Sequence, residues 1–382
     1  MQVVILGAGF GGLELSARLS ETLGAEADVV LIDRSEGFVF GFSKLDVMFG
    51  RTTAPAVLHR YEDVVMPGVR FVAADITSFD PKTRRVVTTE GTFSADILVV
   101  ALGAELEPSA TPGLVEAGHE FYTEAGAFAL RDVLDEFSGG RVVVGVCSTP
   151  FKCPPAPSEA ALLVDELLTR KGVRQASEVH LVMPLPVPIP PSPLASGALL
   201  DAFAERNIHF HPNTVVREID GDRKVVLLDE DGTDRELPYD LFLGVPKHRV
   251  PAVVTASGMA VNGWIPVDPL TLETRFPSVY AIGDVTSVGT PKAGVFAERQ
   301  ASVVADRIVA ESRGEKGPTY DGVGVCYLEF GDDQVAGVEV TFRAGEPPVG
   351  TFAEPSPELA AQKSEFGSSR VRRWFGKDWV AH

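Results

Sequence analysis

The chain has 382 residues, of which 45% are hydrophobic and 23% are charged, and its formal net charge is −19. This length favours two or three domains with a sizeable core, and the acidic charge argues against binding along nucleic acid, which requires a basic surface. The three cysteines are too few for a disulfide framework. They therefore serve redox or catalytic chemistry, or are buried as small hydrophobic residues.

The first predicted elements form a dinucleotide-binding turn. An apolar strand at the start of the chain is followed by Gly-Ala-Gly-Phe-Gly-Gly and then by a helix. Gly7 permits a tight turn, Gly9 lets the backbone approach a pyrophosphate, and Gly12 lets the helix pack on the strand. Asp33 ends the next strand, where a carboxylate can accept hydrogen bonds from ribose hydroxyls. Arg34, the next residue, is a further candidate for contact with the nucleotide.

One pattern occurs twice along the chain. Residues 84–103 and 223–246 each read as a hairpin followed by a buried strand. Each ends a longer unit that opens with an apolar strand and a helical pattern, at 2–9 and at 141–148. Because strands that alternate with helices form parallel sheets covered on both faces, we predict an α/β protein with two Rossmann-like domains.

Two segments resemble the paired motifs of FAD-dependent pyridine nucleotide–disulfide reductases. They are ILVVALGAE at residues 97–105 and FPSVYAIGDVTSV at 276–288. In that superfamily the aspartate of the second motif holds the ribitol chain of FAD, so the resemblance implies this role for Asp284. It also implies that Gly103 and Gly283 lie at the cofactor, and FAD is the predicted cofactor.

The second domain is predicted to be inserted in the first. Residues 1–112 and 263–317 would form the FAD-binding domain, and residues 113–262 the inserted NAD-binding-like domain. Residues 318–382 differ in composition from the rest of the chain, with further predicted strands, a proline-rich segment and a basic aromatic end. We expect them to form a small C-terminal α+β region.

The inserted domain is predicted to lack a nicotinamide site. Residues 142–168 read as a strand, a turn and a helix, where an NAD(P)H-binding domain would repeat the glycine turn. Pro150 in this turn has no N–H to donate to a phosphate. The next strand, 178–184, ends in Met-Pro instead of an acidic residue. Electrons must therefore reach the flavin from another donor.

Sulfur replaces glycine in this second turn. Cys153 precedes a helix predicted to begin at Ser158, and a helix N-terminus favours a thiolate over a thiol. The thiolate is the form that exchanges disulfides. Cys147 is interpreted either as a third sulfur handler or as strand packing, and packing is the favoured interpretation.

Three segments resemble sulfide-oxidising flavoproteins. PFKCPPAPSEAA, around Cys153, is similar to the loop of flavocytochrome c sulfide dehydrogenase flavoprotein subunits, and residues 322–332 resemble the region that carries the partner cysteine in that family. Residues 291–308 resemble the segment after the FAD motif in those subunits and in sulfide:quinone oxidoreductases. Two cysteines face the flavin and carry sulfane sulfur in this family.

The resemblance implies roles for four residues. Cys153 and Cys326 correspond to the redox cysteine pair. Glu159 matches the acid that follows the first cysteine and could move a proton, although a first-turn glutamate also simply suits the helix dipole. Lys292 is expected beside the flavin, where it would stabilise the reduced ring, and the alternative is a surface lysine.

The predicted function is FAD-dependent oxidation of sulfide or a related sulfur compound, with quinone as the expected acceptor. One alternative is a type II NADH dehydrogenase-like enzyme, which would need the nicotinamide site that residues 142–168 argue against. The other is a flavin-binding scaffold without turnover. No metal site and no oligomeric state are predicted.

The C-terminal residues 363–382 interleave basic and aromatic side chains. This composition suits a membrane surface, but also a tail whose aromatic residues pack on the flavin domain, and both alternatives stay open. No secretory signal is visible, and six prolines in residues 181–200 exclude a spanning helix there. The protein is therefore predicted to be cytoplasmic, with peripheral contact to the inner face of the cell membrane as a further possibility.

Overall fold

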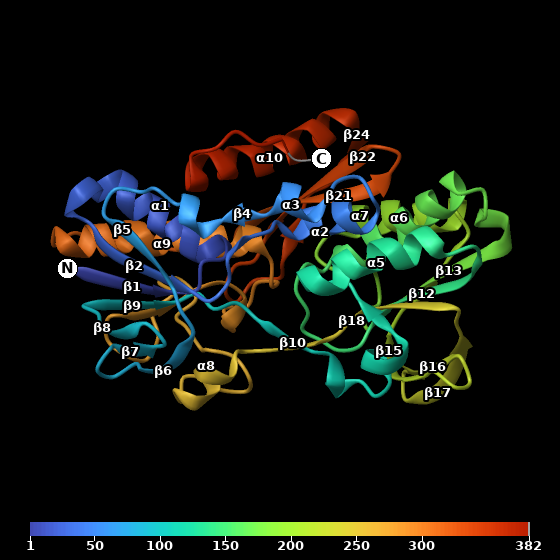
Figure 1. Ribbon diagram of the computed structural model, residues 1–382, viewed down its shortest axis with the longest axis horizontal. Helices are drawn as coiled ribbons and strands as arrows, with labels where there is room; N and C mark the ends of the chain where they lie inside the picture. Colours follow the sequence, from blue (N-terminus) through green and yellow to red (C-terminus); the bar gives the residue numbers. More distant parts are fainter. Residues whose placement is uncertain (381–382) are drawn as a thin grey trace.

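The computed structural model describes residues 1–380, and Figure 1 shows two α/β units side by side with a helix from the end of the chain above them. In the unit on the left, one parallel sheet has the order β20-β9-β1-β2-β5. Its strands are β1 (Gln2–Leu6), β2 (Asp28–Asp33), β5 (Val69–Ala73), β9 (Ile97–Val100) and β20 (Val279–Ala281). Since β20 follows the second unit in the chain, this sheet combines segments that lie on both sides of that unit in the sequence.

The strands of this sheet are runs of Val, Ile and Leu because both faces are covered. Helices α1 (Phe10–Leu23) and α9 (Gly294–Ser312) pack on one face. The other face packs against an antiparallel sheet and a short helix. These elements are β6 (Ile76–Asp80), β7 (Arg85–Thr88), β8 (Gly91–Ser94) and α8 (Ala252–Ala256).

The unit on the right of Figure 1 repeats this plan. Its parallel sheet has the order β11-β18-β12-β13-β14. The strands are β11 (His119–Glu120), β12 (Gly140–Val146), β13 (Ser177–Val182), β14 (Ile208–His211) and β18 (Leu241–Val245). One face packs on α5 (Glu124–Glu136), α6 (Ala156–Arg170) and α7 (Pro193–Glu205). The other packs on β15 (Thr214–Asp220), β16 (Val225–Glu230) and β17 (Thr233–Pro238).

The repeated pattern in the sequence corresponds to the same structure in both units. Strands β7 and β8 pair as a hairpin before β9, and β16 and β17 pair as a hairpin before β18. The predicted fold class, with two Rossmann-like units on parallel sheets, is confirmed. The connections between the units include the antiparallel pair of β10 (Glu105–Glu107) and β19 (Lys247–Arg249).

The last part of the chain forms an antiparallel sheet and a long helix. These are β21 (Val323–Gly331), β22 (Gln334–Thr341), β23 (Val349–Gly350), β24 (Ala353–Ser356) and α10 (Pro357–Phe375). The remaining short elements are β3 (Gly37–Phe38), α2 (Gly41–Met48), α3 (Ala54–Val57), β4 (His59–Arg60) and α4 (Leu114–Ala117). Strand β21 packs on α6, and so the C-terminal region bridges the two units.

Helix α10 turns its aromatic residues inward. Trp374 and Phe375 are buried in the same core as α1, and the Trp374 indole donates to Glu14 at 3.2 Å. Arg370 forms an ion pair with Glu298 at 2.9 Å. For these residues the structure shows packing on the unit that contains α1 and α9, while residues 381–382 of the predicted segment lie outside the described part. Within residues 1–380 no helix is long and apolar enough to cross a membrane.

Candidate active site

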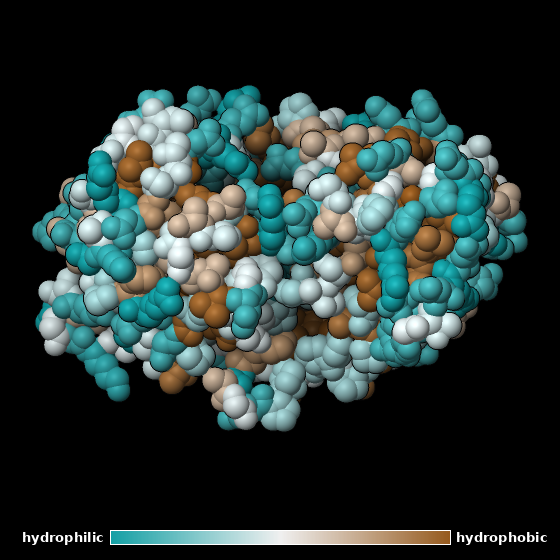
Figure 2. Space-filling view, turned by 90° about the horizontal axis from the view of Figure 1, so that it is seen from below, coloured by the Kyte–Doolittle hydropathy of each residue, from teal (hydrophilic) through white to brown (hydrophobic). Residues whose placement is uncertain are grey.

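A cavity of about 910 Å³ lies between the two units, within the volume range of cofactor sites. Figure 2 shows the lower face of the molecule, where hydrophilic residues predominate and the surface is hollowed between the two halves. Ten of the residues predicted for the site line the cavity: Gly7, Gly9, Asp33, Arg34, Gly103, Cys153, Glu159, Gly283, Asp284 and Cys326. Gly12, Lys292 and Cys147 do not line it.

The glycine turn before α1 leaves room for a ligand. Gly9 is the N-cap of α1, no side chain caps the helix, and a Cβ at Gly9 would meet nothing within 4 Å. Gly7 has φ +100°, and a Cβ there would lie 2.5 Å from the carbonyl of Ala101. At Gly12 a Cβ would lie 1.9 Å from the Gly7 carbonyl, which explains its position outside the cavity wall. An uncapped helix N-terminus with an open approach fits a pyrophosphate.

Asp33 both fixes this turn and faces the cavity. Its Oδ2 accepts from the Ala8 amide at 2.7 Å and its Oδ1 from the Ser35 amide at 2.8 Å. A carboxylate oxygen has a second lone pair, so ribose hydroxyls can still bind. Arg34 is mostly exposed and forms an ion pair with Glu105 at 3.4 Å.

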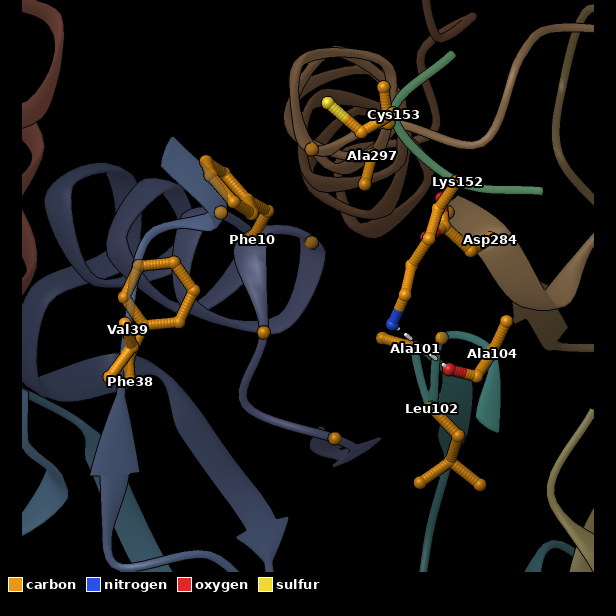
Figure 3. A pocket seen from close by; sticks show the side chains of 18 of the residues that line it. Phe10, Phe38, Val39, Ala101, Leu102, Ala104, Lys152, Cys153, Asp284 and Ala297 are labelled. Atoms are coloured by element: carbon orange, nitrogen blue, oxygen red, sulfur yellow. Dashed lines mark hydrogen bonds between the residues drawn. The ribbon is translucent and has the colours of Figure 1, made fainter. Parts of the chain in front are cut away.

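The second FAD motif lies on the opposite side of the same cavity. Gly283 has φ +75° and Gly103 has φ +64°, conformations that favour glycine. Burial raises the pKa of Asp284, because a desolvated carboxylate without enough partners is disfavoured. Figure 3 shows Asp284 at the cavity across from Phe10. The carboxyl group fits a polyhydroxy chain that would supply hydroxyl donors.

The Lys292 side chain does not line the cavity, although the adjacent Ala293 does, and its position beside the flavin stays a prediction. Its ammonium donates to the carbonyls of Asp284 at 2.6 Å and Thr286 at 3.1 Å. It also lies 3.2 Å from the centroid of the Trp264 ring, and burial lowers its pKa to about 8. The ammonium is held by these partners, away from the cavity, and therefore supports the Asp284 loop.

Three other lysines line the cavity, Lys44, Lys152 and Lys363, and sequence reasoning missed all of them. Figure 3 shows the Lys152 side chain extended across the cavity, and its Nζ donates to the carbonyl of Ala104 at 3.3 Å. Lys44, on α2, donates to the carbonyl of Tyr122. Burial, and then the charge of Lys152, lower the pKa of Lys44 to about 8. The only sequence signal was that Lys152 adjoins the predicted redox cysteine.

Backbone hydrogen bonds hold Cys153 in place. The residue has φ +51°, which is uncommon outside glycine. Its amide donates to the carbonyl of Lys292 at 2.7 Å, and its carbonyl accepts from the Ala156 amide at 2.9 Å and from the Tyr122 hydroxyl at 3.3 Å. The partners in these hydrogen bonds come from both units. The backbone of Cys153 is therefore held by contacts to both sides of the cavity.

Helix α6 begins earlier than predicted. Its N-cap is Pro155 and not Ser158, because the amides of Ser158 and Glu159 already donate to the Pro155 carbonyl. The hydroxyl of Ser158 is buried and caps nothing. Cys153 is therefore closer to the helix N-terminus than the sequence suggested.

The structure brings two of the three cysteines to one cavity. Cys326, on β21, lines the same cavity as Cys153. Cys147 instead lies in an apolar cluster with Val143 and Phe242, outside the cavity wall. This placement agrees with packing as the role of Cys147.

The surroundings of the two cavity thiols favour the protonated form, although Cys153 is exposed to the open cavity. Burial, then the charge of Glu159, then that of Cys326 raise the pKa of Cys153 well above its usual range. The Ala156 amide at the start of α6 favours the thiolate but is outweighed. The helix N-terminus therefore acts in the expected direction, but burial and the neighbouring charges have the larger effect on the pKa of Cys153.

Glu159 can supply a base for these thiols. Burial raises its pKa to about 7, and the charges of Lys363 and Arg51 oppose the increase. Burial and then Glu159 also raise the pKa of Cys326, to about 12. A carboxyl group that titrates near neutrality beside two thiols can accept and return their protons.

The model of the pyridine nucleotide-disulphide oxidoreductase family matches residues 1–301. The chain belongs to this family. It is also 25% identical to the mitochondrial sulfide:quinone oxidoreductase of Mus musculus, over 92% of this chain and 80% of that protein. The solved sulfide:quinone oxidoreductase of Aquifex aeolicus superposes with a TM-score of 0.80, at 22% identity, covering 97% of this chain and 91% of the other.

A shorter similarity extends to another class of this family. The type II NADH:quinone oxidoreductase of Staphylococcus haemolyticus is 30% identical, but over only 36% of this chain and 35% of that protein. In sequence, the match to the Mus musculus protein thus covers far more of this chain than the match to this NADH-oxidising relative.

Proposed function

We propose that the chain is an FAD-dependent oxidoreductase that oxidises sulfide through Cys153 and Cys326 and passes the electrons to a quinone. One observation carries the proposal: both cysteines and Glu159 line the same cavity as the glycine turn and Asp284. The similarity to sulfide:quinone oxidoreductases over most of the chain supports the same substrate and acceptor.

The cysteines carry the sulfur chemistry. Hydrosulfide attacks the Cys153–Cys326 disulfide, forming one S–S bond and breaking another, which leaves a persulfide on one cysteine and a thiolate on the other. Joining this thiolate to the persulfide as a trisulfide releases two electrons, and FAD supplies the site that accepts them. Glu159 takes the proton of the incoming sulfur species.

The apolar part of the cavity supports a lipid-soluble acceptor. Phe42, Val325, Tyr327 and Phe366 line it near Cys326. Phe42 and Phe366 lie edge to face at 6.5 Å between centroids, and Val325 is 39% exposed. A quinone ring would fit such aromatic and aliphatic surfaces. Because Trp374 and Phe375 are buried, another surface would make the contact with the membrane that holds the quinone.

The direct test is anaerobic addition of sulfide to the purified holoprotein while the flavin absorbance is followed. We expect stoichiometric bleaching by sulfide, none by NADH, and reoxidation by a short-chain ubiquinone. Bleaching by NADH but not by sulfide would overturn the proposal in favour of an NADH dehydrogenase. Bleaching by neither reagent would favour a non-catalytic scaffold.

A further inference from the structure

A cluster of buried charged side chains lies beside Glu159. Its members are Asp46 on α2, Arg51 just after α2, Glu329 on β21 and Lys363 on α10. Glu329 is 4% exposed and Lys363 is 5% exposed. Charges are rarely buried to this extent without paired partners, because their desolvation costs free energy. The cluster is therefore expected to serve the site that it adjoins.

The contacts form one continuous chain that ends at Glu159. Arg51 forms ion pairs with Asp46 at 2.8 Å and with Glu329 at 2.6 Å. Lys363 forms an ion pair with the other carboxylate oxygen of Glu329. The amide of Glu329 donates to the Glu159 carboxyl at 3.0 Å. The residue that holds the Lys363 ammonium thus also holds Glu159.

Lys363 is the cation of this cluster that faces the reaction space. It lines the cavity together with Glu159 and both predicted redox cysteines. Its ammonium also lies 5.1 Å from the centroid of the Phe42 ring. Lys363 is the largest of the charges that lower the pKa of Glu159, followed by Arg51, while Asp46 raises it.

The other titratable groups near Glu159 do not lower its pKa as Lys363 and Arg51 do. Cys153 and Cys326 face it from the loop before α6 and from β21. Tyr122 faces it as well, and its pKa is raised by burial and then by the charges of Cys153 and Glu159. The charge of Cys153 acts on Lys44, as do those of Lys152, Glu124 and Glu120. Lys363 and Arg51 thus remain the cations that act on the carboxyl.

We propose that Lys363, held by Glu329 and Arg51, is the positioning residue that keeps Glu159 able to exchange protons with the cysteine pair near neutral pH. In each exchange a proton moves from a cysteine Sγ to a Glu159 oxygen and later returns. The part of Lys363 in turnover rests on the proposed function, but its electrostatic effect on Glu159 does not. The effect can therefore be measured without sulfide.

The test uses the rate of thiol alkylation by iodoacetamide in the reduced, full-length holoprotein, as a function of pH. Peptide mass spectrometry separates Cys153 and Cys326 from the buried Cys147. Ionised Glu159 disfavours both thiolates, so each rate profile should bend near the pH at which Glu159 titrates. Glu159→Gln should remove this bend.

Replacing Lys363 alone leaves Glu329 buried with a single cationic partner, so the main variant is the neutral pair Lys363→Met/Glu329→Gln. We expect the bend to move up, because the largest charge that lowers the pKa of Glu159 is lost, but by less than the shift of about one to three pH units that is typical of losing an opposite charge alone, because the negative charge of Glu329 is lost with it. The single variant Lys363→Arg keeps the positive charge, so its bend should lie within a few tenths of a pH unit of the wild-type bend. Arg372→Met is the matched control, because it removes a mostly exposed cation from the same helix; it should leave the bend in place.

Circular dichroism and thermal unfolding show whether each variant is folded. If the paired variant does not fold, Arg51→Gln takes its place, with the same upward direction expected because Arg51 also lowers the pKa of Glu159. An unmoved bend in a folded variant, or a wild-type profile without a bend that depends on Glu159, would overturn the proposal. If the bend moves in the variant but sulfide does not reduce the flavin of the wild-type protein, the proposed function is rejected. The electrostatic effect of Lys363 on Glu159 is then still supported.

Discussion

The two α/β units place a strand–turn–helix at the same cavity but build the turn from different residues. Before α1 the turn holds glycines and the N-cap is Gly9; before α6 it holds Cys153 and prolines, and the N-cap is Pro155. Both turns contain a residue with positive φ, a glycine in the first and Cys153 in the second. One backbone plan thus presents free amides to a phosphate in one unit and a sulfur atom in the other.

The difference between the turns is also electrostatic. At the first turn, open backbone and an uncapped helix end favour an anion. At the second, burial and the charge of Glu159 outweigh the helix end and raise the pKa of Cys153, so the proposed sulfur chemistry would need a base. Glu159, in the first turn of α6, has its pKa raised to about 7 by burial and is placed to act as that base. Exchanging glycine for cysteine therefore required an acid–base group that a phosphate site does not need.

The largest expected effect is on the second turn. Cys153→Ser should reduce the rate of sulfide-driven flavin reduction by at least about 10³-fold, because the sulfur that accepts hydrosulfide is lost. FAD content should stay at the wild-type level, since the first turn is intact. Stopped-flow absorbance checks the rate, and reduction by dithionite is the control. Unchanged reduction by sulfide would show that the second turn has no redox role.

Glu159→Gln should lower the same rate by about 10²-fold, the usual effect of losing a general base. The burial-raised pKa of about 7 gives the sign: the carboxylate base is present above pH 7 and lost as the pH falls through 7. The ratio of the wild-type rate to the variant rate should therefore fall below pH 7. Using the ratio cancels the ionisation of sulfide itself. A ratio that does not vary with pH would argue for a purely structural Glu159.

The two α/β units and the different residues of their turns could be predicted from the sequence, because glycine spacing and strand–helix alternation are local patterns. The positions of Lys44, Lys152 and Lys363 could not, since packing of α2, the Cys153 loop and α10 brings them to the cavity from distant parts of the chain. The contacts of Lys292 could not be predicted for a related reason. Its sequence neighbours suggested the cofactor, while the carbonyls and the ring that hold its ammonium become neighbours only in the folded protein.

The pairing of the two cysteines shows the same limit. Cys153 stands out in the sequence because it lies in the turn, but Cys326 lies on a strand of the C-terminal region with no distinguishing local pattern. Only the resemblance to a family connected the two, and the structure then places them in one cavity. Tertiary structure supplies what spacing cannot when two partners are far apart in the chain.

A smaller effect is expected at the first turn. Gly12→Ala would place a Cβ 1.9 Å from the Gly7 carbonyl, so the backbone must shift, at a cost of about 1–3 kcal/mol. We expect a lower melting temperature and weaker FAD retention, measured by thermal unfolding and by gel filtration. Gly197→Ala is the matched control, because a Cβ at this glycine of α7 meets nothing within 4 Å. Equal losses in both variants would show that the crowding at Gly12 is not decisive.

The smallest effect is expected at Cys147, which begins the second turn but packs away from the cavity. Cys147→Ala removes a buried sulfur from an apolar cluster and should lower stability by about 1 kcal/mol. The rate of sulfide-driven flavin reduction should stay within twofold of wild type, because burial raises the pKa of this thiol to about 12 and the thiol lies outside the wall of the cavity that holds Cys153. A large loss of reduction with stability intact would instead make Cys147 a sulfur carrier. The sulfur chemistry of the second turn would then involve Cys147, directly after β12, as well as Cys153 in the loop.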